Sequence, residues 1–382
     1  MYATPNLRTR HRVVALDLPT PRWMRAPGEA PGSFAVESAL DELAAELGMD
    51  PVELRIRNEP GVEPETGLPY SSRSLVACLR EGAQRFGWHE RDPRPGVRRE
   101  GRTVVGTGVA CATYPARTVP STARATAEAD GTFTVRITAT DIGTGARTAL
   151  TQVAADELGV MPDGVRVLIG DSDFGTAVVA ADSMGMSSWS FAVVKACRAL
   201  LKLLRDGQSR PVSATVDTAE DLQGMAPLAR HSFGAQFAEA RVDIDTGEVR
   251  VPRMLGMFGA GRIVNPATAR SQLVGGMIWG LGMALHEESI LDVEYGDYVN
   301  HDLASYHIPV SADIGAIEAD WVDEVDGQLN PLGVKGLGEI GIVGAAAAIA
   351  NAVWHATGVR QRDLPIRPDR IQVSLPGLPS TC

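Results

Sequence analysis

The run IGIVGAAAAIANAVWHATG, residues 340–358, limits the possible folds of this chain more than any other stretch, because almost every side chain in it is apolar. A helix that is apolar all round has no face to offer to water and has to be buried. A second such stretch, SQLVGGMIWGLGMAL at 271–285, is too short and too rich in glycine to span a bilayer. We therefore expect two buried helices, and 382 residues are enough for one large domain or two with cores that enclose them.

The overall composition is that of a soluble globular protein, with 44 % hydrophobic and 22 % charged residues. The net charge of −11 and the lack of basic clusters beside aromatic side chains argue against nucleic-acid binding. The densest basic run, ERDPRPGVRREGR at 90–102, contains prolines and acids of its own and is interpreted as an exposed linker. We expect neither a nucleic acid nor a membrane as a partner.

The four cysteines, Cys78, Cys111, Cys197 and Cys382, are far apart and form no CxxC or Cys/His cluster. This spacing argues against a zinc site, an iron–sulfur site or a disulfide framework within the chain. Free thiols are usual in a reducing compartment, and the opening residues MYATPNLRTRHRVV lack the apolar core of a signal peptide. We expect a cytoplasmic location, with periplasmic export on a partner's signal as the alternative.

Helical periodicity and turn residues divide the first part of the chain into elements. Helices are predicted over 32–48, 49–58 (with Pro51 in the first turn), 72–88, 146–160 and 187–207, the last being the longest. Alternating strands are predicted over 103–114 and over 121–145 with a turn at Asp130-Gly131, and the stretch 165–173 is predicted to begin as a strand and leave into a loop. The linker at 90–102 is expected to separate a first domain, 1–90, from a second, 91–382.

A pattern of hairpin, glycine loop and helix occurs twice. The first round contains TATDIGTGARTAL. The second has two strands within 231–261, joined at Asp245-Thr246-Gly247, then the loop 262–268 and the buried helix that ends near Leu285. We interpret the rounds as two related units of an α+β fold, with mixed sheets and packed helices, whose loops face one ligand.

Four glycine loops lie where helix N-termini offer free N–H groups and partial positive charge to anions, namely 141–145, 181–185, 262–268 and 335–338. Each loop alone is better explained by the turns and caps that ordinarily start helices. Together, and with Arg262 and Lys335 among them, they suggest a phosphate-bearing cofactor. None matches a P-loop or a Rossmann pattern, so neither kind of site is supported.

Glu339 stands in GVKGLGEIG, residues 333–341, among four glycines. Glycine removes the side chains that would keep a ligand away from the backbone. The acid is either a first-turn glutamate that completes the capping of the next helix or a functional group held at the helix start. WMRAPGEAPG at 23–32 raises a similar question for Arg25, which precedes a rigid turn and forms either an incidental salt bridge or a cofactor contact.

Several blocks resemble one protein family. MRAPGEAPGSFAVESALDELAAELGMDPVELRIRN is similar to the segment around the RAPG turn in the molybdenum-cofactor subunit of the xanthine dehydrogenase and aldehyde oxidoreductase family. Similar blocks follow in the family's order: DIGTGARTALTQVAADELG, ARVDIDTGEVRV, GRIVNPATARSQLVGG, LASYHIPV and GVKGLGEIGIVGAAAAIANAV. The resemblance covers nearly the whole chain, and its nearest match is to bacterial aldehyde-oxidising subunits. It implies molybdopterin-binding domains and the cofactor molybdopterin cytosine dinucleotide with molybdenum.

The resemblance gives individual residues a role. Glu339 matches the catalytic base beside the molybdenum, which the pterin dithiolene holds without a protein ligand. Gln272 matches a glutamine that hydrogen-bonds the pterin. The other residues matched to cofactor contacts are Arg25, Ile142, Gly143, Thr144, Met184, Gly185, Arg262, Ile263, Val264, Asn265, Pro266, Ala267, Thr268, Lys335, Gly336, Leu337 and Gly338.

The implied activity is oxidation of an aldehyde to a carboxylic acid with water as the oxygen source. Electrons would pass to 2Fe-2S and FAD groups on an iron–sulfur subunit and an FAD subunit. The family's subunit is about twice as long, so the N-terminal half of the molybdenum subunit is expected as a further partner, and it carries much of the substrate funnel. Two alternatives stay open: hydroxylation of an N-heteroaromatic such as a purine, and a truncated remnant without catalysis.

Overall fold

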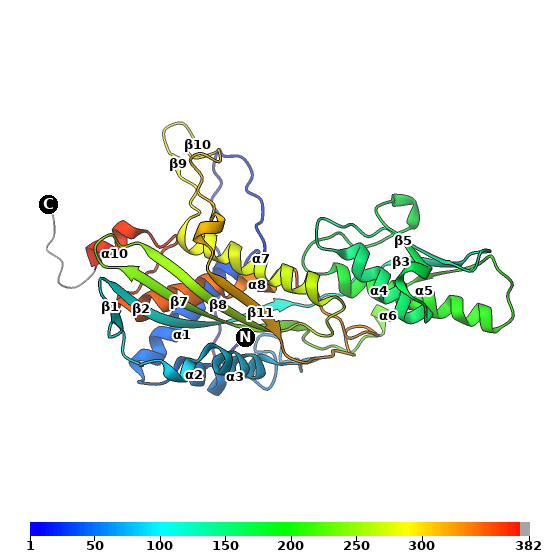
Figure 1. Cartoon of the computed structure of the whole chain (residues 1–382), viewed down its shortest axis with the longest axis horizontal. Helices are drawn as coiled ribbons and strands as arrows, with labels where there is room; N and C mark the ends of the chain where they lie inside the picture. The colour runs from blue at the N-terminus through cyan, green and yellow to red at the C-terminus, as the bar shows by residue number, and fades with distance from the viewer. Residues whose placement is uncertain (375–382) are drawn as a thin grey trace.

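The computed structural model describes residues 1–374 and shows two mixed β-sheets with helices packed on them (Figure 1). The larger sheet contains, in spatial order, β1 (Arg99–Glu100), β2 (Thr103–Pro115), β7 (His231–Asp243), β8 (Val249–Gly259) and β11 (Ala316–Trp321). The smaller sheet contains β5 (Val165–Leu168), β4 (Phe133–Ile137), β3 (Thr122–Ala127) and β6 (Val212–Asp217). The expected α+β class, with mixed sheets and packed helices, is confirmed.

The two rounds of the sequence have the same order of elements in space. In the first, the antiparallel hairpin β3–β4 is followed by α4 (Ala146–Leu158), and β5 then pairs parallel to β4. In the second, the antiparallel hairpin β7–β8 is followed by α7 (Pro266–Leu285), and β11 then pairs parallel to β8. The parallel strand β11 was not expected from the sequence, and it extends the likeness of the two units.

The apolar run at 340–357 forms two helices, α8 (Ile340–Val343) and α9 (Ala345–Thr357), where one was expected. The run divides at Gly344, where a Cβ would lie 2.5 Å from the Gln236 Oε1 and 3.0 Å from the Cys111 carbonyl oxygen, so only glycine fits. By length and composition alone the run could cross a membrane, yet 94 % of it is buried inside the protein. The prediction that this stretch is buried is therefore confirmed.

Helix α9 lies directly on strand β2, and small residues on both elements allow this close contact. A Cβ on Gly106 or Gly108 would overlap the backbone of α9, at Ala356 and Ala352 respectively. The small alanine side chains of α9 and the glycines of β2 thus let the helix and the strand approach each other closely. Helix α7 packs against α8 and α9 in the same manner, with Gly280 against Ala345.

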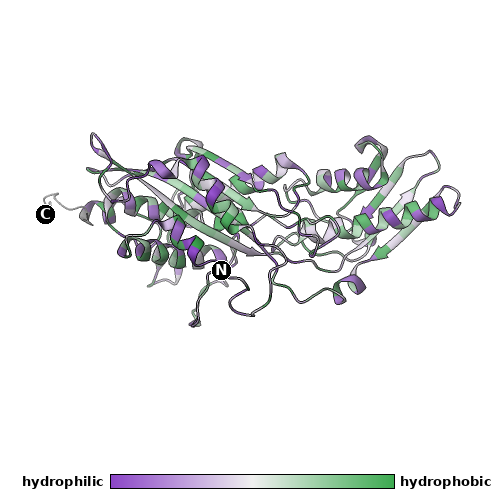
Figure 2. Ribbon diagram, turned by 90° about the horizontal axis from the view of Figure 1, so that it is seen from below, coloured by the Kyte–Doolittle hydropathy of each residue, from purple (hydrophilic) through white to green (hydrophobic). Residues whose placement is uncertain are grey.

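Strand β7 separates two layers of the core, because successive side chains of a strand point to opposite faces. Phe233 and Phe237 face the helix α3 (Leu75–Phe86), whereas Ala238 and Ala240 face α9. Figure 2 shows hydrophobic residues along the strands and alternating hydrophilic and hydrophobic residues in the helices that cover them. The larger sheet is therefore covered on both faces.

The N-terminal helices belong to this larger unit. Helix α1 (Glu29–Glu46) packs on α9 and β2, α2 (Pro51–Arg57) packs on α1 and α3, and α3 packs on β7 and β8. Asp50 caps α2, with Pro51 in the first turn as expected. Residues on both sides of position 90 share one core. The division into domains 1–90 and 91–382 stays a prediction.

Two cores meet along one short segment. Leu332 and Val334 pack in the core of the smaller sheet with α5 (Gly185–Arg205), the longest of the described helices. Leu337 and Ile340 pack in the core of the larger sheet. We call residues 332–340 the glycine strip, and it crosses from one core to the other just before α8.

The remaining elements are short. They are α6 (Ala219–Gln223), α10 (Pro368–Ser374), β9 (Leu291–Asp292), β10 (Asp297–Tyr298) and the 3-10 turns Trp88–Glu90, Pro162–Gly164, Ser172–Phe174 and Ser311–Asp313. The strand expected at the start of 165–173 ends at Leu168 and leads into a loop, as expected, and β6 was not expected. Strands β9 and β10 pair with each other in a projecting arm, which lies above α7 in Figure 1.

Candidate active site

Glu339 lies at the end of the glycine strip, half-buried, with a hydrogen bond to each carboxylate oxygen. The backbone N–H of Ala26 donates to Oε1 over 3.1 Å, and the Ser183 hydroxyl donates to Oε2 over 3.4 Å. The Glu339 N–H in turn donates to the Ser183 Oγ over 3.0 Å. The acid is therefore fixed by two segments that are far from it in sequence.

The backbone around Glu339 is strained. Ala26, Asp182 and Ser183 have φ values of 53°, 51° and 53°, and they are the non-glycine residues with positive φ between residues 1 and 374. Such conformations cost about 1–3 kcal/mol each and persist only where the surrounding structure enforces them. All three lie in the segments that hold Glu339, so this strain marks the site as a functional candidate.

Arg25 connects three of the predicted site residues. Its Nε donates to the Gly338 carbonyl, and its Nη2 donates to the Gln272 carbonyl over 2.7 Å and to the Gln272 Oε1 over 3.5 Å. Burial lowers the pKa of Arg25, while the charge of Glu339 acts in the opposite direction. The structure thus brings together Arg25, Gln272, Gly338 and Glu339. The hydrogen bonds of Arg25 go to the Gly338 carbonyl and to Gln272 and not to a carboxylate, so the prediction of an incidental salt bridge is wrong.

Tyr114, at the end of β2, completes this group. Burial and a hydrogen bond to Glu339 raise the pKa of Tyr114 well above its ordinary value, so it stays a neutral phenol. Burial also raises the pKa of Glu29, and the charge of Glu339 adds to that effect. Tyr114 and Ser183 are functional candidates that the sequence analysis missed, and only Ser183, in a predicted glycine loop, carried any signal.

The glycines around Glu339, in the strip and at the start of α8, serve two purposes. At Gly336 a Cβ would overlap the Ser183 carbonyl, and at Gly341 it would lie 2.6 Å from the Leu273 carbonyl oxygen. These two glycines therefore accommodate the protein's own chain, which corrects the interpretation that all four admit a ligand. At Gly338 a Cβ would lie at ordinary contact distance from the Ser183 Oγ (3.6 Å) and the Gln272 Oε1 (3.9 Å), and Gly338 is partly exposed, so its backbone is partly accessible beside Glu339.

Lys335 does not offer a cation to this site. Its side chain is fully buried, and its ammonium group binds Glu324, Ser72 and the carbonyl of His231. The expectation of an anion-binding ammonium at 335 is therefore wrong, because acidic and hydroxyl groups of the protein already satisfy it. The assignment of Lys335 to the cofactor contacts stays a prediction that concerns its backbone.

The loops at the starts of α4 and α7 lie against each other. A Cβ on Gly145 would come within 2.6 Å of the Thr268 methyl group, and the Asn265 side-chain amide donates to the Gln152 Oε1 over 2.9 Å. Asn265 also caps α7 by accepting from the Thr268 N–H. The structure thus brings the predicted loops 141–145 and 262–268 together, with Gln272 one turn further along α7.

The N-terminus of α4 already holds an anion of its own. Asp141 accepts hydrogen bonds from the N–H groups of Gly143, Gly145 and Arg147. Partial burial would raise the pKa of Asp141, but these backbone bonds outweigh it and lower that pKa. An external anion at these N–H groups, as the sequence analysis suggested, would compete with Asp141.

The other predicted contact residues are spread around this centre. Ile142 is 68 % exposed at the loop tip, and Arg262 is exposed near Asp156. Met184 and Gly185 begin α5 directly after Ser183. Gly143, Thr144, Ile263, Val264, Pro266, Ala267 and Leu337 lie in the same loops and strip. Their roles as cofactor contacts stay predictions.

The residues present fit a cofactor that carries its metal with it. Within residues 1–374 no group of three or more His, Cys, Asp or Glu side chains could hold a metal ion. The centre instead offers a carboxylate, an amide and accessible backbone at Gly338, which suit a pterin that supplies the metal's own ligands.

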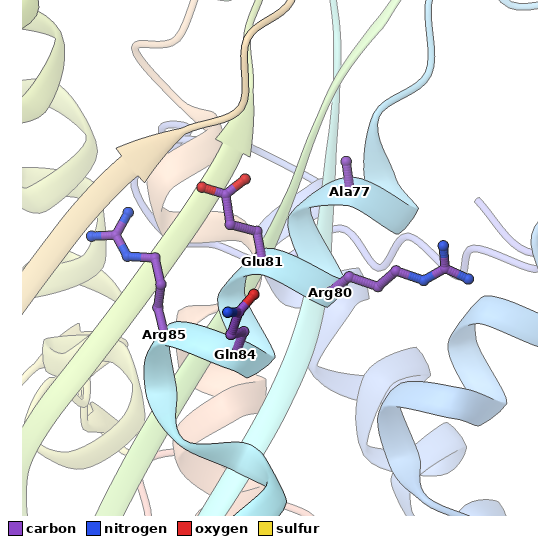
Figure 3. A pocket seen from close by; sticks show the side chains of 5 residues that line it. All are labelled: Ala77, Arg80, Glu81, Gln84 and Arg85. Atoms are coloured by element: carbon purple, nitrogen blue, oxygen red, sulfur yellow. The ribbon is translucent and has the colours of Figure 1, made fainter.

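A hollow lies elsewhere on the molecule. It has about 700 Å³ and is lined by Ala77, Arg80, Glu81, Gln84 and Arg85 of α3. In Figure 3 the two arginines point away from each other across the helix, so their charges do not converge on a common point. None of the predicted site residues borders this hollow, and we do not consider it a candidate active site.

Comparison with known proteins identifies the class. Family profiles described as molybdopterin cofactor-binding domains match residues 1–59, 81–220 and 212–315. The chain therefore belongs to the molybdopterin-binding subunits of the xanthine dehydrogenase and aldehyde oxidoreductase family, as the sequence blocks implied.

Two curated relatives narrow the comparison. The chain is 42 % identical to the aldehyde oxidoreductase molybdenum-binding subunit PaoC of Escherichia coli K12, over 98 % of this chain and 55 % of that protein. It is 34 % identical to the xanthine dehydrogenase molybdenum-binding subunit of Escherichia coli O157:H7, over 93 % of this chain and 53 % of that protein. The chain thus spans about half the length of these relatives.

Solved structures agree on the fold. The aldehyde oxidoreductase from Desulfovibrio desulfuricans matches with a TM-score of 0.80 and 26 % identity, over 92 % of this chain and 41 % of that one. Quinoline 2-oxidoreductase from Pseudomonas putida 86 matches with a TM-score of 0.82 and 22 % identity, over 93 % of this chain and 53 % of that one, which shows the fold alone.

Proposed function

We propose that this chain supplies the catalytic base and part of the cofactor site of an enzyme that oxidises an aldehyde to a carboxylic acid. The observation that carries the proposal is the placement of Glu339, held by Ala26 and Ser183 beside Gln272 and the accessible backbone of Gly338. The identity of 42 % with an aldehyde oxidoreductase subunit supports the choice of aldehydes. Its main rival is a purine, since a xanthine dehydrogenase subunit is 34 % identical.

The overall reaction converts an aldehyde and water into a carboxylic acid, two protons and two electrons. The bound molybdenum cofactor would supply the electron acceptor and the site of oxygen transfer. Glu339 would accept one proton as the carbon–oxygen bond forms. Its two oxygens accept hydrogen bonds from Ala26, Ser183 and Tyr114, and a carboxylate has about four lone-pair sites, so one stays free for that proton. A positioned base of this kind contributes roughly 10²–10⁴ to the rate.

The neighbouring residues hold the base and the cofactor in place. Gln272 would bind the pterin through its amide, and Arg25 fixes Gln272 and Gly338 relative to each other. Tyr114 stays protonated across the working pH range, so it can donate to Glu339 without competing for the proton. The turn that contains Ala26 and the loop that contains Ser183 keep the carboxylate at one position on the strip.

The cofactor and the partners are part of the same proposal. We propose molybdopterin cytosine dinucleotide as the form bound, an iron–sulfur subunit and an FAD subunit as electron acceptors, and the N-terminal half of the molybdenum subunit as a further partner. The matched relatives are nearly twice as long as the aligned region, which supports the N-terminal half of the molybdenum subunit as a partner. We propose assembly in the cytoplasm, with export on a partner's signal as the alternative.

The test is metal and nucleotide analysis of the chain co-expressed with its genomic neighbours. Molybdenum and CMP, released by acid hydrolysis in roughly equal amounts, would support the proposed cofactor. Assays with aldehydes and purines then decide the substrate class, and turnover of purines alone would replace the aldehyde proposal with its rival. No molybdenum in the presence of the partners would contradict the proposal and favour a non-catalytic remnant.

A further inference from the structure

The glycine strip reaches Glu339 through a segment with little rigidity of its own. Gly333, Gly336 and Gly338 alternate with larger residues, and glycine leaves the backbone free to adopt many conformations. The position of Glu339 therefore depends on contacts that hold the strip from outside. Backbone hydrogen bonds join Gly333 and Lys335 to the segment 260–262. Two further sets of contacts, to the loop before α5 and through the side chain of Lys335, hold the strip close to Glu339.

In the first set of contacts the strip lies against the loop before α5. Gly336 touches the Ser183 carbonyl so closely that a Cβ would overlap it. A slip of the strip by one residue would bring the side chain of Lys335 or Leu337 to this point and push Ser183 away. Because the Ser183 hydroxyl binds both the N–H and the carboxylate of Glu339, such a slip would displace the base.

In the second set of contacts the strip is held by the side chain of Lys335, which is 1 % exposed. Its Nζ donates to the Glu324 Oε1 over 2.5 Å, the Ser72 Oγ over 2.5 Å and the His231 carbonyl over 2.7 Å. An ammonium group has three protons to donate, so these three acceptors satisfy it fully. The Asp326 carboxylate lies 3.6 Å away and adds a second negative charge.

The partners of Lys335 come from three separate segments of the larger unit. Ser72 precedes α3, His231 begins β7, and Glu324 follows β11. The carboxylates are held in turn, since the Ser74 hydroxyl donates to Glu324 and the Ser71 hydroxyl donates to Asp326. One ammonium group therefore ties the strip to the framework of the larger sheet, next to the contact of Gly336 with Ser183.

We propose that Lys335 is a positioning residue, whose buried ammonium group fixes the register of the glycine strip and so places Glu339 for proton transfer. This inference rests on the proposed function of Glu339, and it adds a role for a cluster that touches neither Glu339 nor the accessible face at Gly338. Lys335 acts through the strip and takes no part in the reaction itself.

The test uses the complex co-purified with its partners and the variants Lys335→Met and Lys335→Met with Glu324→Gln. The single variant leaves two buried carboxylates without their cation, which destabilises a protein strongly. The double variant removes one of those charges, so folding recovers while the ammonium anchor stays absent. Amide hydrogen exchange of peptides covering 332–341 measures how readily the backbone of the strip opens, and this measurement does not require an active enzyme.

Three results are expected in both variants. Amides of the strip exchange roughly tenfold faster or more, because the segment opens locally. The kcat falls by about 10²-fold, as for a misplaced catalytic group, while KM stays within a few-fold. Molybdenum content per folded complex stays at the wild-type level. Arg360→Met is the control, since it removes another largely buried ion pair, with Asp41, and among the described residues the hydrogen bonds of Arg360 go to Asp41 and Asn351 and not to the strip.

The outcomes separate this inference from the proposed function. Wild-type strip exchange and wild-type kcat in a folded double variant would overturn the positioning role. The same loss of kcat in Arg360→Met would also overturn it, because any buried ion pair would then suffice. A wild-type complex without molybdenum and without turnover would instead contradict the proposed function, and hydrogen exchange would still show whether Lys335 fixes the strip.

Discussion

At the scale of single residues, Glu339 combines fixed placement with partial exposure. Its carboxylate receives hydrogen bonds from the Ala26 N–H and from the hydroxyls of Ser183 and Tyr114. Ala26 and Ser183 have left-handed backbone conformations. The carboxylate is therefore held at a defined position while part of it stays exposed.

Variants of Ser183 separate the hydroxyl from the backbone strain. Ser183→Ala and Ser183→Gly both remove the group that binds Glu339, and we expect both to lower turnover by roughly tenfold or more, since a misplaced base loses much of its effect. Glycine adopts a positive φ without strain. The free energy of unfolding of Ser183→Gly should therefore be about 1 kcal/mol higher than that of Ser183→Ala. Turnover assays and urea titrations check both; wild-type turnover in either variant would contradict the role of the hydroxyl.

The sequence indicated some of these residues and not others. Glu339 and Arg25 stood out because each lies beside glycine or proline in a short stretch, which is a local signal. Tyr114 ends an ordinary strand, and its contact with Glu339 depends on how β2 meets the strip. Lys335 was misread for a related reason: a lysine in a glycine loop looks available to an anion, and its acidic partners lie on other elements.

At the scale of elements, the contact between α9 and β2 fixes the position of the apolar run at 340–357. The helix rests on Gly106 and Gly108, whose missing side chains let the two backbones approach. Helix α8 follows Glu339 directly and α9 follows α8, so this contact also fixes the end of the glycine strip. The packing of one helix therefore supports the site.

Gly108→Ala tests this contact, with Gly32→Ala as its control. At Gly108 a Cβ would overlap the carbonyl of Ala348 and the N–H of Ala352, both backbone groups that do not yield easily. We expect a loss of about 1–3 kcal/mol in the free energy of unfolding, or more. Gly32 lies within α1 with open space around it, so alanine there should raise the stability by about 0.5–1 kcal/mol. Equal effects of the two variants in urea titrations would contradict the packing.

Local patterns predicted most helices and both hairpins, because periodicity and turn residues act over a few positions. The helices α1, α4, α5 and α7 lie within a few residues of their expected ranges. Strands β6 and β11 were missed, since each pairs with a strand far away in sequence, β3 and β8 respectively. The break at Gly344 was also missed, because the atoms that leave room only for glycine there belong to β2 and β7.

At the scale of the whole molecule, the site lies where two cores meet. The glycine strip leaves the core of the smaller sheet at Val334 and enters that of the larger sheet at Leu337. Ser183 comes from the smaller unit and Ala26 from the larger one, and both bind Glu339. The geometry of the base therefore depends on the whole chain being folded.

Stability of the whole molecule should fall in mild acid. Burial, and next the charge of Arg91, lower the pKa of His355 to about 4. The Thr107 N–H donates to its Nδ1, and the ring binds the Asp92 carbonyl through Nε2, so the neutral ring is the form held. An unfolded histidine has a pKa of about 6.5, so the unfolded chain binds a proton between about pH 6.5 and 4 that the native chain does not. This contribution to stability is complete above about pH 6.5 and is lost as the pH falls toward 4.

Urea titrations at several pH values check this. Each such histidine adds at most about 1.4 kcal/mol per pH unit to the slope of stability against pH. His355→Gln should remove that part of the slope between pH 6.5 and 4, while His89→Gln, at an exposed histidine, should leave it unchanged. An unchanged slope in His355→Gln would contradict the account of His355.

The central claim is that Glu339 is the base of a molybdenum-cofactor site, and one measurement tests it most directly. Turnover and molybdenum content are compared in the co-purified complex for wild type, Glu339→Gln and the surface control Glu42→Gln, whose carboxylate pairs with Arg362. We predict full molybdenum content in all three and a loss of roughly 10²–10⁴ in turnover for Glu339→Gln alone. Near-normal turnover of Glu339→Gln with full molybdenum content would contradict the claim.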